Sequence, residues 1–381
     1  MISVIAIILG FASYAFVILS VFRLLRVNYF NPIVKIFATY LEPVSKSLFF
    51  FLPPLFAAIA VALMFKFISF YSNSKRSLNL KIAIHAFFHC LLKQYDLIIS
   101  RNIYASFLFS IILRRSLIFE THQLEHGVLK FIQKLIMLNK KNTTLVISEK
   151  LKELLIDHHQ LSLHKIVVLH DAAPAGLLIA KENKRDLLFK LYEEIDPDYE
   201  LVCGYFGSLF EGRGINVVER MAEKRSSNLF LVFGGDQKIV QDKISSNLYK
   251  NLKFMGHSSH RESLEIMRLC DVLLMPYQKE VSIGVKNHDT GRWMSPIKMF
   301  EYMSSGVPII SSDLPVLREV LENGRNALLV EYDSITAWCK ALDNISKDKT
   351  LAGYLGKEAY RDYQDKYTWS ERGKKILDIK L

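Results

Sequence analysis

The stretch "MSPIKMFEYMSSGVPIISSDLPVLREV" at residues 294–320 predicts a short helix followed directly by a buried strand. Ser295 and Pro296 predict the helix start, because serine caps free amides and proline suits the first helical position. Gly306 and Pro308 predict its end. The strand "VPIISS" is apolar without alternation, which is typical of a parallel sheet covered on both faces. The stretch therefore predicts a repeat of an α/β fold.

A carboxylate lies on the apolar stripe of this predicted helix. Glu301 follows Ile297 by four residues and Phe300 by one, so we expect it to face the protein interior. A buried glutamate needs a partner, because an isolated buried charge is costly. Taken alone, the residue is interpreted as part of a structural ion pair or of a hydroxyl contact at a helix end.

Apolar runs alternate with helical patterns through the rest of the chain after residue 75. The runs are "YDLIIS", "SLIFETH", "TTLVIS", "HKIVVLH", "ELVCGYFG", "NLFLVFGG", "NLKFMG", "DVLLMPY", "VPIISS" and "ALLVEY". Such alternation predicts parallel sheets with helices on both faces. The charged stretch at residues 180–200 divides the series into two doubly wound α/β domains, which are expected to face a ligand-binding cleft.

The net charge and the cysteine content indicate which ligands and partners the chain can bind. The formal net charge of +11 suits an anionic membrane or a phosphorylated ligand. No basic run with interleaved aromatics is present, so nucleic acid is not an expected partner. The four cysteines are scattered without a CxxC pair or a histidine cluster at metal spacing, so neither a disulfide framework nor a metal site is expected.

The first seventy residues differ from the rest. Residues 1–22 carry no charge and are long enough to cross a bilayer. Arg23 and Arg26 follow this run, whereas a cleaved signal peptide has basic residues before it, so we expect an uncleaved span. A second run at residues 48–65 contains Pro53-Pro54 and spans, re-enters or lies in the interface. If only the first run spans, the basic loop and the C-terminal part are both cytoplasmic, which we favour.

Three glycines predict a phosphate-binding turn in "GYFGSLFEGRGINVVERM", residues 204–221. Gly207, Gly212 and Gly214 lie between a strand and a helix, and Arg213 adds a fixed positive charge. The alternative is a tight strand-to-helix turn with an exposed arginine. The spacing approaches a P-loop, but a glycine at 214 cannot supply the hydroxyl that holds magnesium, so an ATPase is not expected.

Two further strand ends carry candidate residues. "LVFGGDQ" places Gly235 directly after a strand, and "NLKFMGHSSH" places His257 after the next one. Taken singly, His257 and His260 are interpreted as surface or cap-region histidines.

The ordered motifs "GSLFEGRGI", "FGGD", "NLKFMGH", "CDVLLMPY", "SPIKMFEYMSSGVPIISSDLPVLREVL" and "NGRNALLV" resemble the nucleotide-binding domain of the retaining GT-B glycosyltransferases of family 4, over about residues 200–345. "YDLIISRN", "IFETHQLEHG", "LVISEKLKELL" and "KIVVLHDAAP" resemble part of that family's acceptor-side domain, so the likeness extends over about 76–381. Residues 1–70 resemble the YggT family of membrane proteins through "NPI", "EP" and "LPP".

The resemblance implies four parts. These are a YggT-like membrane segment (1–72), a partial acceptor-side Rossmann-like domain (76–180), a nucleotide-sugar-binding Rossmann-like domain (181–360) and a C-terminal helix (361–381). The usual first strand and glycine-rich loop of the acceptor-side domain are replaced by the membrane segment, so the first domain is expected to be truncated.

The resemblance also implies a site. It assigns Glu301 to the ribose hydroxyls of a nucleotide-sugar donor, Arg213 to the diphosphate and His122 to the neighbourhood of the donor sugar. The implied catalytic residues are His122, Arg213 and Glu301, and the implied donor-binding residues are Gly207, Ser208, Arg213, Gly235, His257, Ser295, Pro296, Ile297, Lys298 and Glu301. No metal or cofactor is expected, because the nucleotide sugar is a substrate and cationic side chains with helix ends stabilise the leaving diphosphate.

The implied function is that of a membrane-associated retaining glycosyltransferase, with its catalytic part in the cytoplasm and a lipid-linked or cell-envelope polysaccharide acceptor. The family pairs two glutamates eight positions apart, and Trp293 stands where the first would be. This departure and the missing first strand are the reason for an alternative, a catalytically degenerate GT-B nucleotide-binding or scaffold protein anchored to the membrane. In a third interpretation the function lies in the YggT-like segment.

Overall fold

The computed structural model of the chain describes residues 75–93, 95–161, 165–174, 184–282 and 289–379. Ala86–Leu381 forms a compact unit that carries both sheets of the described chain. The predicted membrane segment at residues 1–72 lies outside the described residues. Of the helices that are described, none is both long and apolar enough to span a bilayer.

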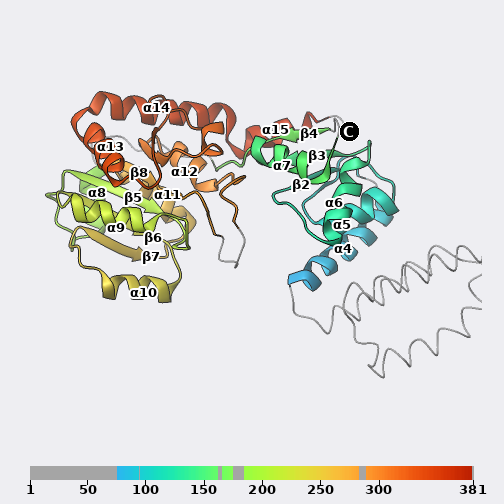
Figure 1. The fold of residues 1–381 in the computed structure, drawn as a ribbon, viewed down its shortest axis with the longest axis horizontal. Coiled ribbons are helices and arrows are strands. Elements are labelled where there is room, and N and C mark those ends of the chain that lie inside the picture. The colour runs from blue at the N-terminus through green and yellow to red at the C-terminus, as the bar shows by residue number, and fades with distance from the viewer. Residues whose placement is uncertain (1–74, 94, 162–164, 175–183, 283–288, 380–381) are drawn as a thin grey trace, which may run out of the picture. The chain divides into compact units, whose positions relative to one another are not determined.

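Helices and strands alternate along the chain (Figure 1). In chain order the described elements are α4 (Lys75–Leu92), β1 (Ile99–Ser100), α5 (Ile103–Phe107), the π-helical η1 (Leu108–Ile112), β2 (Ile118–Thr121), α6 (Val128–Leu138), β3 (Thr143–Val146), α7 (Glu149–His159), β4 (Ile166–Val168), α8 (Lys184–Leu191), β5 (Leu201–Phe206), α9 (Ile215–Lys224), β6 (Asn228–Phe233), α10 (Gln237–Ser246), β7 (Leu252–Gly256), α11 (His260–Leu269), β8 (Val272–Met275), α12 (Ile297–Ser305), β9 (Ile309–Ser312), the 3₁₀ turn η3 (Leu317–Glu319), β10 (Leu328–Val330), α13 (Ile335–Lys347), α14 (Lys349–Lys366) and α15 (Trp369–Leu377). Every strand predicted from an apolar run is present.

The strands form two parallel sheets. The first has the order β1-β2-β3-β4, and the second has the order β10-β9-β8-β5-β6-β7. In the second sheet the chain builds β5, β6 and β7 in one direction and then returns to place β8 on the other side of β5. The carboxyl ends of β5 and β8 are therefore a topological switch point, where connections leave in opposite directions and a ligand can bind.

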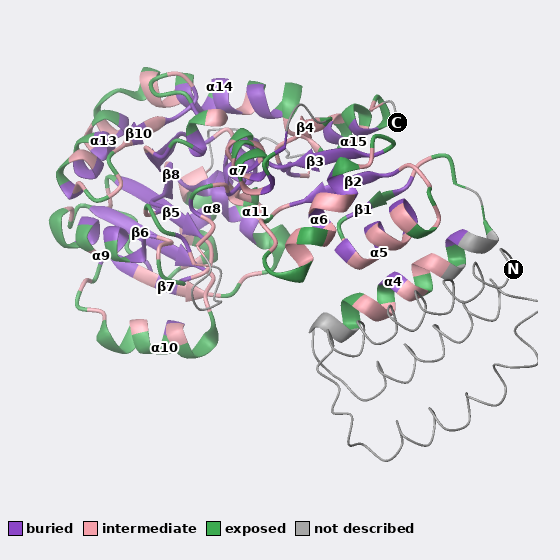
Figure 2. Cartoon of the chain, turned by 45° about the vertical axis from the view of Figure 1, so that its right-hand side comes forward, coloured by how far each residue is buried: buried purple, intermediate pink, exposed green. Residues whose placement is uncertain are grey.

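The second sheet is buried on both faces. Leu201, Cys203 and Tyr205 of β5 pack in one apolar cluster with residues of α9 and α13, while Val202 and Phe206 pack in the other with residues of α11 and α12. This division follows from the two-residue period of a strand, since successive side chains point to opposite faces. Figure 2 shows the buried strands enclosed by helices whose outer sides are exposed. The continuous apolar runs correctly predicted this arrangement.

The chain returns to the first sheet after α14. Thr368 forms a bridge with Ala173, just beyond β4. In α15, Arg372 donates from Nε to the His170 carbonyl at 3.0 Å and from Nη2 to Glu120 Oε1 at 2.9 Å. The last helix is thus part of the covering of the N-terminal sheet, although it follows the C-terminal one in sequence.

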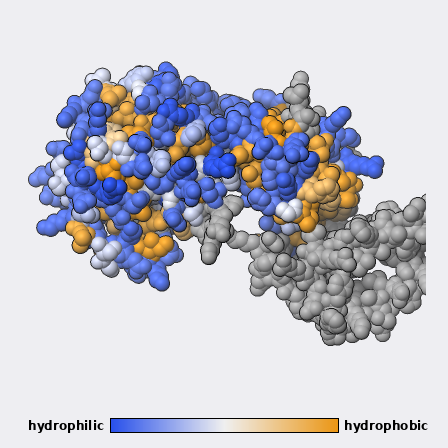
Figure 3. All heavy atoms as spheres, in the orientation of Figure 1, coloured by the Kyte–Doolittle hydropathy of each residue, from blue (hydrophilic) through white to orange (hydrophobic). Residues whose placement is uncertain are grey.

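The described surface is mainly hydrophilic on the face shown in Figure 3, and hydrophobic residues form separate patches between the polar ones. The exposed large hydrophobic side chains include Leu248, at 85% exposure, and Phe131, at 63%. The buried hydrophobic side chains pack instead between the helices and the second sheet.

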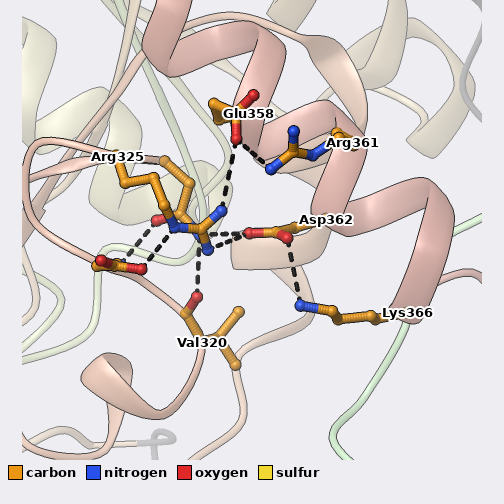
Figure 4. A network of polar contacts seen from close by, with 8 residues as sticks. Val320, Arg325, Glu358, Arg361, Asp362 and Lys366 are labelled. Carbon is orange, nitrogen blue, oxygen red and sulfur yellow. Dashed lines mark hydrogen bonds and ion pairs between the residues drawn. The ribbon is translucent and has the colours of Figure 1, made fainter.

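A cluster of charges fastens α14 to the loop before β10 (Figure 4). Arg325 pairs with Asp362 and Glu358, two largely buried carboxylates of α14. Asn326 and Lys366 also contact Asp362. Burial by itself would raise the pKa of Asp362, but the hydrogen bonds from Arg325, Asn326 and Lys366 outweigh burial and hold the pKa below its ordinary value. The cluster is therefore a stabilising contact at neutral pH.

We expect Arg325→Met to lower the free energy of unfolding by about 2 kcal/mol, because it removes charged hydrogen bonds from buried carboxylates. The loss should be complete at neutral pH and shrink as the pH falls below about 4, where the carboxyl of the unfolded chain becomes protonated. Urea unfolding at several pH values measures this.

Arg361→Met is the matched control, since Arg361 pairs with Glu358 from an exposed position. An equal loss in both variants, or a loss independent of pH, would contradict the assigned role of Arg325.

Candidate functional site

A cavity of about 140 Å³ lies at the switch point between β5 and β8. Strand ends, the glycine turn after β5 and helix α12 enclose it. Its lining consists of Tyr205, Phe206, Gly207, Ser208, Arg213, Leu274, Met275, Pro276, Tyr277, Lys298 and Tyr302. The sequence prediction placed a ligand site at strand carboxyl ends, and this cavity lies there.

The turn after β5 depends on glycines because it passes close to the loop after β8. Gly212 and Gly214 have φ values of 79° and 83°. A Cβ at Gly214 would lie 1.8 Å from the Pro276 carbonyl oxygen, and one at Gly212 would lie 1.9 Å from that of Glu280. Only glycine meets both the conformation and the close approach. The two loops therefore pack backbone against backbone, with Arg213 between the two glycines.

Arg213 is held at this cavity by an aromatic residue. Its guanidinium carbon lies 5.3 Å from the ring centre of Tyr277, and Nη1 hydrogen-bonds to the Tyr277 hydroxyl at 3.2 Å. Burial raises the pKa of Tyr277, while Arg213 acts in the opposite direction, so the phenol is neutral at physiological pH. A neutral phenol leaves the positive charge of Arg213 uncompensated by this contact, which suits an anionic ligand.

A second cavity of about 360 Å³ lies at the ends of β5, β6 and β7. It is lined by Phe206, Gly207, Ser208, Phe210, Phe233, Gly234, Gly235, Asp236, His257, Ser258, Ser263 and Lys298. Four residues therefore line both cavities, namely Phe206, Gly207, Ser208 and Lys298. The structure brings the predicted residues Gly235 and His257 to this second cavity, beside the glycine turn.

Glu301 is buried in α12, with 2% of its surface exposed. His260 Nε2 lies 2.8 Å from Oε1, and Lys298 Nζ lies 2.7 Å from Oε2. The lysine contact is an ion pair outside hydrogen-bond geometry, so Oε2 has no hydrogen-bond partner within the described part of the chain. The buried Oε2 thus has a charged neighbour but no hydrogen bond, and Glu301 itself lines neither cavity.

The contact between His260 and Glu301 was not predicted from the sequence. The residue begins α11 behind the Ser259 cap, as the cap-region interpretation expected, and its ring also contacts Glu301, 41 residues away. Tyr302 was missed as well. Its hydroxyl accepts from the Phe206 amide at 2.8 Å, which ties α12 to the end of β5. Neither contact could be read from local spacing, because the partners lie on different elements.

The start of α12 differs from the prediction by one residue. Pro296 is the N-cap, and the helix begins at Ile297. Ser295 does not cap the helix, because its hydroxyl accepts instead from the Asp171 amide of the first sheet at 3.1 Å. The predicted serine cap was therefore wrong, and the physical reason is a competing tertiary hydrogen bond. Ile297 itself is 46% exposed.

His122 lies at the end of β2, in the first sheet, and lines neither cavity. Its Nδ1 lies 3.0 Å from Arg101 Nη2, and its Nε2 lies 2.8 Å from Glu120 Oε1. Because arginine only donates, Nδ1 is assigned as the acceptor and Nε2–H as the donor to Glu120. Burial would raise the pKa of Glu120, but His122 and Arg372 outweigh burial and lower it.

One short segment joins the ends of three strands of the first sheet to α12. The Trp293 indole donates to the His122 carbonyl at 3.2 Å, and the Trp293 carbonyl accepts from the Ser148 hydroxyl at 2.8 Å. Ser295 adds the contact with Asp171. Residues His122, Ser148 and Asp171 follow β2, β3 and β4 respectively. The carboxyl edge of the first sheet therefore borders the start of the helix that carries Glu301.

The free amides at the start of α7 also bind a residue of the second sheet's half. Glu149 and Lys150 donate their backbone N–H groups to the Glu319 carboxylate at 2.7 and 3.0 Å. His170 Nε2 lies 3.8 Å from the same carboxylate. A helix N-terminus attracts anions, and here the anion belongs to the protein itself.

Across the residues described, no cluster of three or more histidine, cysteine, aspartate or glutamate side chains is arranged to hold a metal ion. The expectation of a site without metal or cofactor stays a prediction.

Residues 201–348 match the family described as Glycosyl transferases group 1. The chain carries a glycosyltransferase domain of this group. The expected GT-B-type fold with two parallel sheets is confirmed for the described chain. The YggT-like likeness of residues 1–70 lies outside the described residues and stays a prediction.

Curated relatives match over this domain. The chain is 27% identical over 152 residues to a phosphatidyl-myo-inositol mannosyltransferase of Mycolicibacterium smegmatis, covering 40% of this chain and 36% of that protein. It is 28% identical over 155 residues to the O-antigen chain mannosyltransferase RfbU of Salmonella typhimurium, covering 35% of this chain and 42% of that protein. The match therefore spans well under half the length of these relatives.

Solved structures match over a longer part of the chain. HepE from Anabaena, in complex with UDP, has a TM-score of 0.61 at 16% identity and covers 79% of this chain and 81% of its own. A glycosyltransferase from Rickettsia africae has a TM-score of 0.61 at 15% identity, with coverage of 81% and 82%. At these identities the likeness shows the fold alone.

We expect Gly214→Ala to destabilise the protein by more than the about 1–2 kcal/mol that a left-handed conformation costs alanine, because the new Cβ also meets the Pro276 carbonyl. Gly324→Ala is the matched control, since Gly324 has a φ of 77° with no atom near its absent Cβ. Differential scanning calorimetry of both variants measures the difference. Equal melting temperatures would show that the close approach of the two loops carries no energetic weight.

Proposed function

We propose that this chain is a membrane-associated retaining glycosyltransferase, which moves a sugar from a nucleotide diphosphate to a lipid-linked or cell-envelope acceptor. The observation that carries the proposal is the pairing of Glu301, a buried carboxylate, with Lys298, which lines the switch-point cavity together with Arg213. A carboxylate can accept two hydroxyl donors at once, as a ribose offers.

The proposed chemistry uses the cations of the site. Negative charge gathers on the leaving diphosphate in the transition state, and Arg213, Lys298 and the amides of the turn at Gly207 would stabilise it. The new bond joins the acceptor oxygen to the anomeric carbon as the bond from that carbon to the phosphate oxygen breaks. The acceptor proton leaves with the diphosphate. His122 is proposed to lie near the sugar, on the side of the first sheet.

The donor and acceptor classes are supported by the relatives. HepE has been solved with UDP and with UDP-glucose, and the two curated relatives are mannosyltransferases named for phosphatidyl-myo-inositol and for the O-antigen chain. These names favour a nucleotide hexose as donor and an envelope component as acceptor. The uncharged residues 1–22 support a membrane location, with the transferase part on the cytoplasmic side.

The second candidate function is a nucleotide-binding scaffold without transfer activity. It is supported by Trp293, which replaces the first glutamate of the family's pair and whose indole and carbonyl are both used in contacts with the first sheet. Such a protein would bind the nucleotide through Glu301 and leave the sugar intact.

The first experiment tests nucleotide binding, which both functions require, with a thermal-shift panel on the detergent-purified full chain and UDP, GDP, ADP, CDP and their common hexose conjugates. A ligand at a hundredfold excess over its dissociation constant should add about 2.7 kcal/mol of stability. We expect one nucleotide family to stabilise the wild type, and Glu301→Ala to weaken its binding at least about tenfold through loss of a charged acceptor. Glu223→Ala, on the exposed side of α9, is the control and should bind normally.

Chromatography of the stabilising nucleotide sugar after incubation then distinguishes the two candidates. Release of free nucleoside diphosphate that disappears in Arg213→Ala supports the enzyme. Binding without any turnover, in the presence of membrane extract as an acceptor source, supports the scaffold. If no nucleotide binds to a cooperatively folded chain, both candidates are wrong.

We also expect the full chain to remain in the membrane pellet after a carbonate wash, because an uncleaved apolar span holds a protein more firmly than a surface contact. Added protease should digest the transferase part in inverted vesicles and leave it intact in sealed cells. Release into the wash would contradict the proposed span, and digestion in sealed cells would contradict the cytoplasmic side.

A further inference from the structure

Asp171 is a buried carboxylate that no contact described so far explains. It follows β4, is 8% exposed, and uses its backbone amide to bind Ser295. Within the described part of the chain its carboxylate accepts no hydrogen bond and forms no ion pair. Its oxygens keep some exposure to solvent, so they are free to accept hydrogen bonds from a ligand.

The charged groups that face Asp171 are engaged with one another. Burial is the largest influence and raises the pKa of Asp171, and Glu120 acts in the same direction. His122, Arg372 and Arg101 act in the opposite direction. Arg372 is bound to Glu120, and Arg101 is bound to the His122 ring, so both arginines already have acceptors.

Asp171 also lies beside the helix that we propose to bind the donor. Its partner Ser295 is in the short segment that leads into α12, where Lys298 and Glu301 lie. Trp293 in the same segment is neutral and fixed to His122 and Ser148. The residues from Trp293 to α12 thus offer no carboxylate to a sugar, whereas Asp171 just after the end of β4 does.

We infer that Asp171 is a specificity-determining residue, whose carboxylate accepts hydrogen bonds from hydroxyl groups of the transferred sugar. This inference rests on the proposed function. A sugar with two adjacent hydroxyls matches a carboxylate, because each oxygen accepts one O–H group. A neutral polyhydroxyl ligand would satisfy the carboxylate without requiring another charge in this crowded cluster.

The test compares two affinities of the same full chain, one for a nucleoside diphosphate and one for its sugar conjugate. Calorimetry with UDP and UDP-glucose, or with GDP and GDP-mannose if the guanine nucleotides bind, gives the ratio of the two dissociation constants. Asp171→Asn should weaken binding of the sugar conjugate about tenfold and leave that of the diphosphate unchanged. Glu301→Ala is the control, since it should weaken both ligands to the same extent.

The pH dependence gives a second readout that a structural role would not produce. Because burial raises the pKa of Asp171, its carboxylate is protonated at less acidic pH than usual. We therefore expect the sugar's contribution to binding to fall with decreasing pH in the wild type and to stay constant in Asp171→Asn. The variant should melt at about the same temperature, because no hydrogen bond or ion pair of the carboxylate with a described residue is lost.

Each result supports or overturns the inference. If Asp171→Asn leaves the affinity ratio and its pH dependence unchanged while the sugar conjugate still binds through Glu301, Asp171 does not contact the sugar. If Asp171→Asn fails to fold, Asp171→Ser provides the same comparison, and failure of both to fold shows a structural role and overturns the inference. If no nucleotide binds to the wild type, the proposed function fails first and the inference with it.

Discussion

The reversal of strand order between β5 and β8 is the constraint on which the site depends. Parallel strands joined by right-handed connections must place successive strands on one side until the chain returns to the other. After β7 the chain returns across β5, so the loops after β5 and β8 leave in opposite directions and their strand ends are not covered by a connection. The cavity at this point is a result of topology, and the residues that line it are drawn from three segments, at 205–213, 274–277 and 298–302.

Close backbone packing makes this opening chemically useful. Gly212 and Gly214 let the two loops approach within a distance that no side chain would permit, and Arg213 between them is directed by Tyr277. Helix α12 adds Lys298 and Glu301 from the third side, fixed to β5 through the Tyr302 hydroxyl. Positive charge therefore lines this edge with a buried carboxylate behind it, which suits a ligand that carries both phosphate and hydroxyl groups.

The two sheets meet this helix differently. Met299 and Phe300 of the helix pack in the hydrophobic core with the second sheet, whereas the strand ends of the first sheet hydrogen-bond to the segment before the helix. Trp293 and Ser295 join this segment to three strand ends by hydrogen bonds, and Glu319 makes a separate contact at the start of α7. A movement of this segment would shift α12 relative to the strand ends of the first sheet. The hydrogen bonds of Trp293 and Ser295 therefore help to fix the position of α12.

The sequence alone determined the strands, the parallel character of the sheets and the buried position of Glu301. These features depend on local period and composition: continuous apolar runs identify strands covered on both faces, and glycine spacing identifies the turn that carries Arg213. Tertiary structure alone decided the partners. Ser295 was expected to cap its own helix and instead accepts from Asp171, and His260 was interpreted as a cap-region residue before its contact with Glu301 was seen. Neither contact could be predicted, because a hydrogen bond between residues 41 or 124 positions apart depends on how whole elements pack, and no local pattern records that.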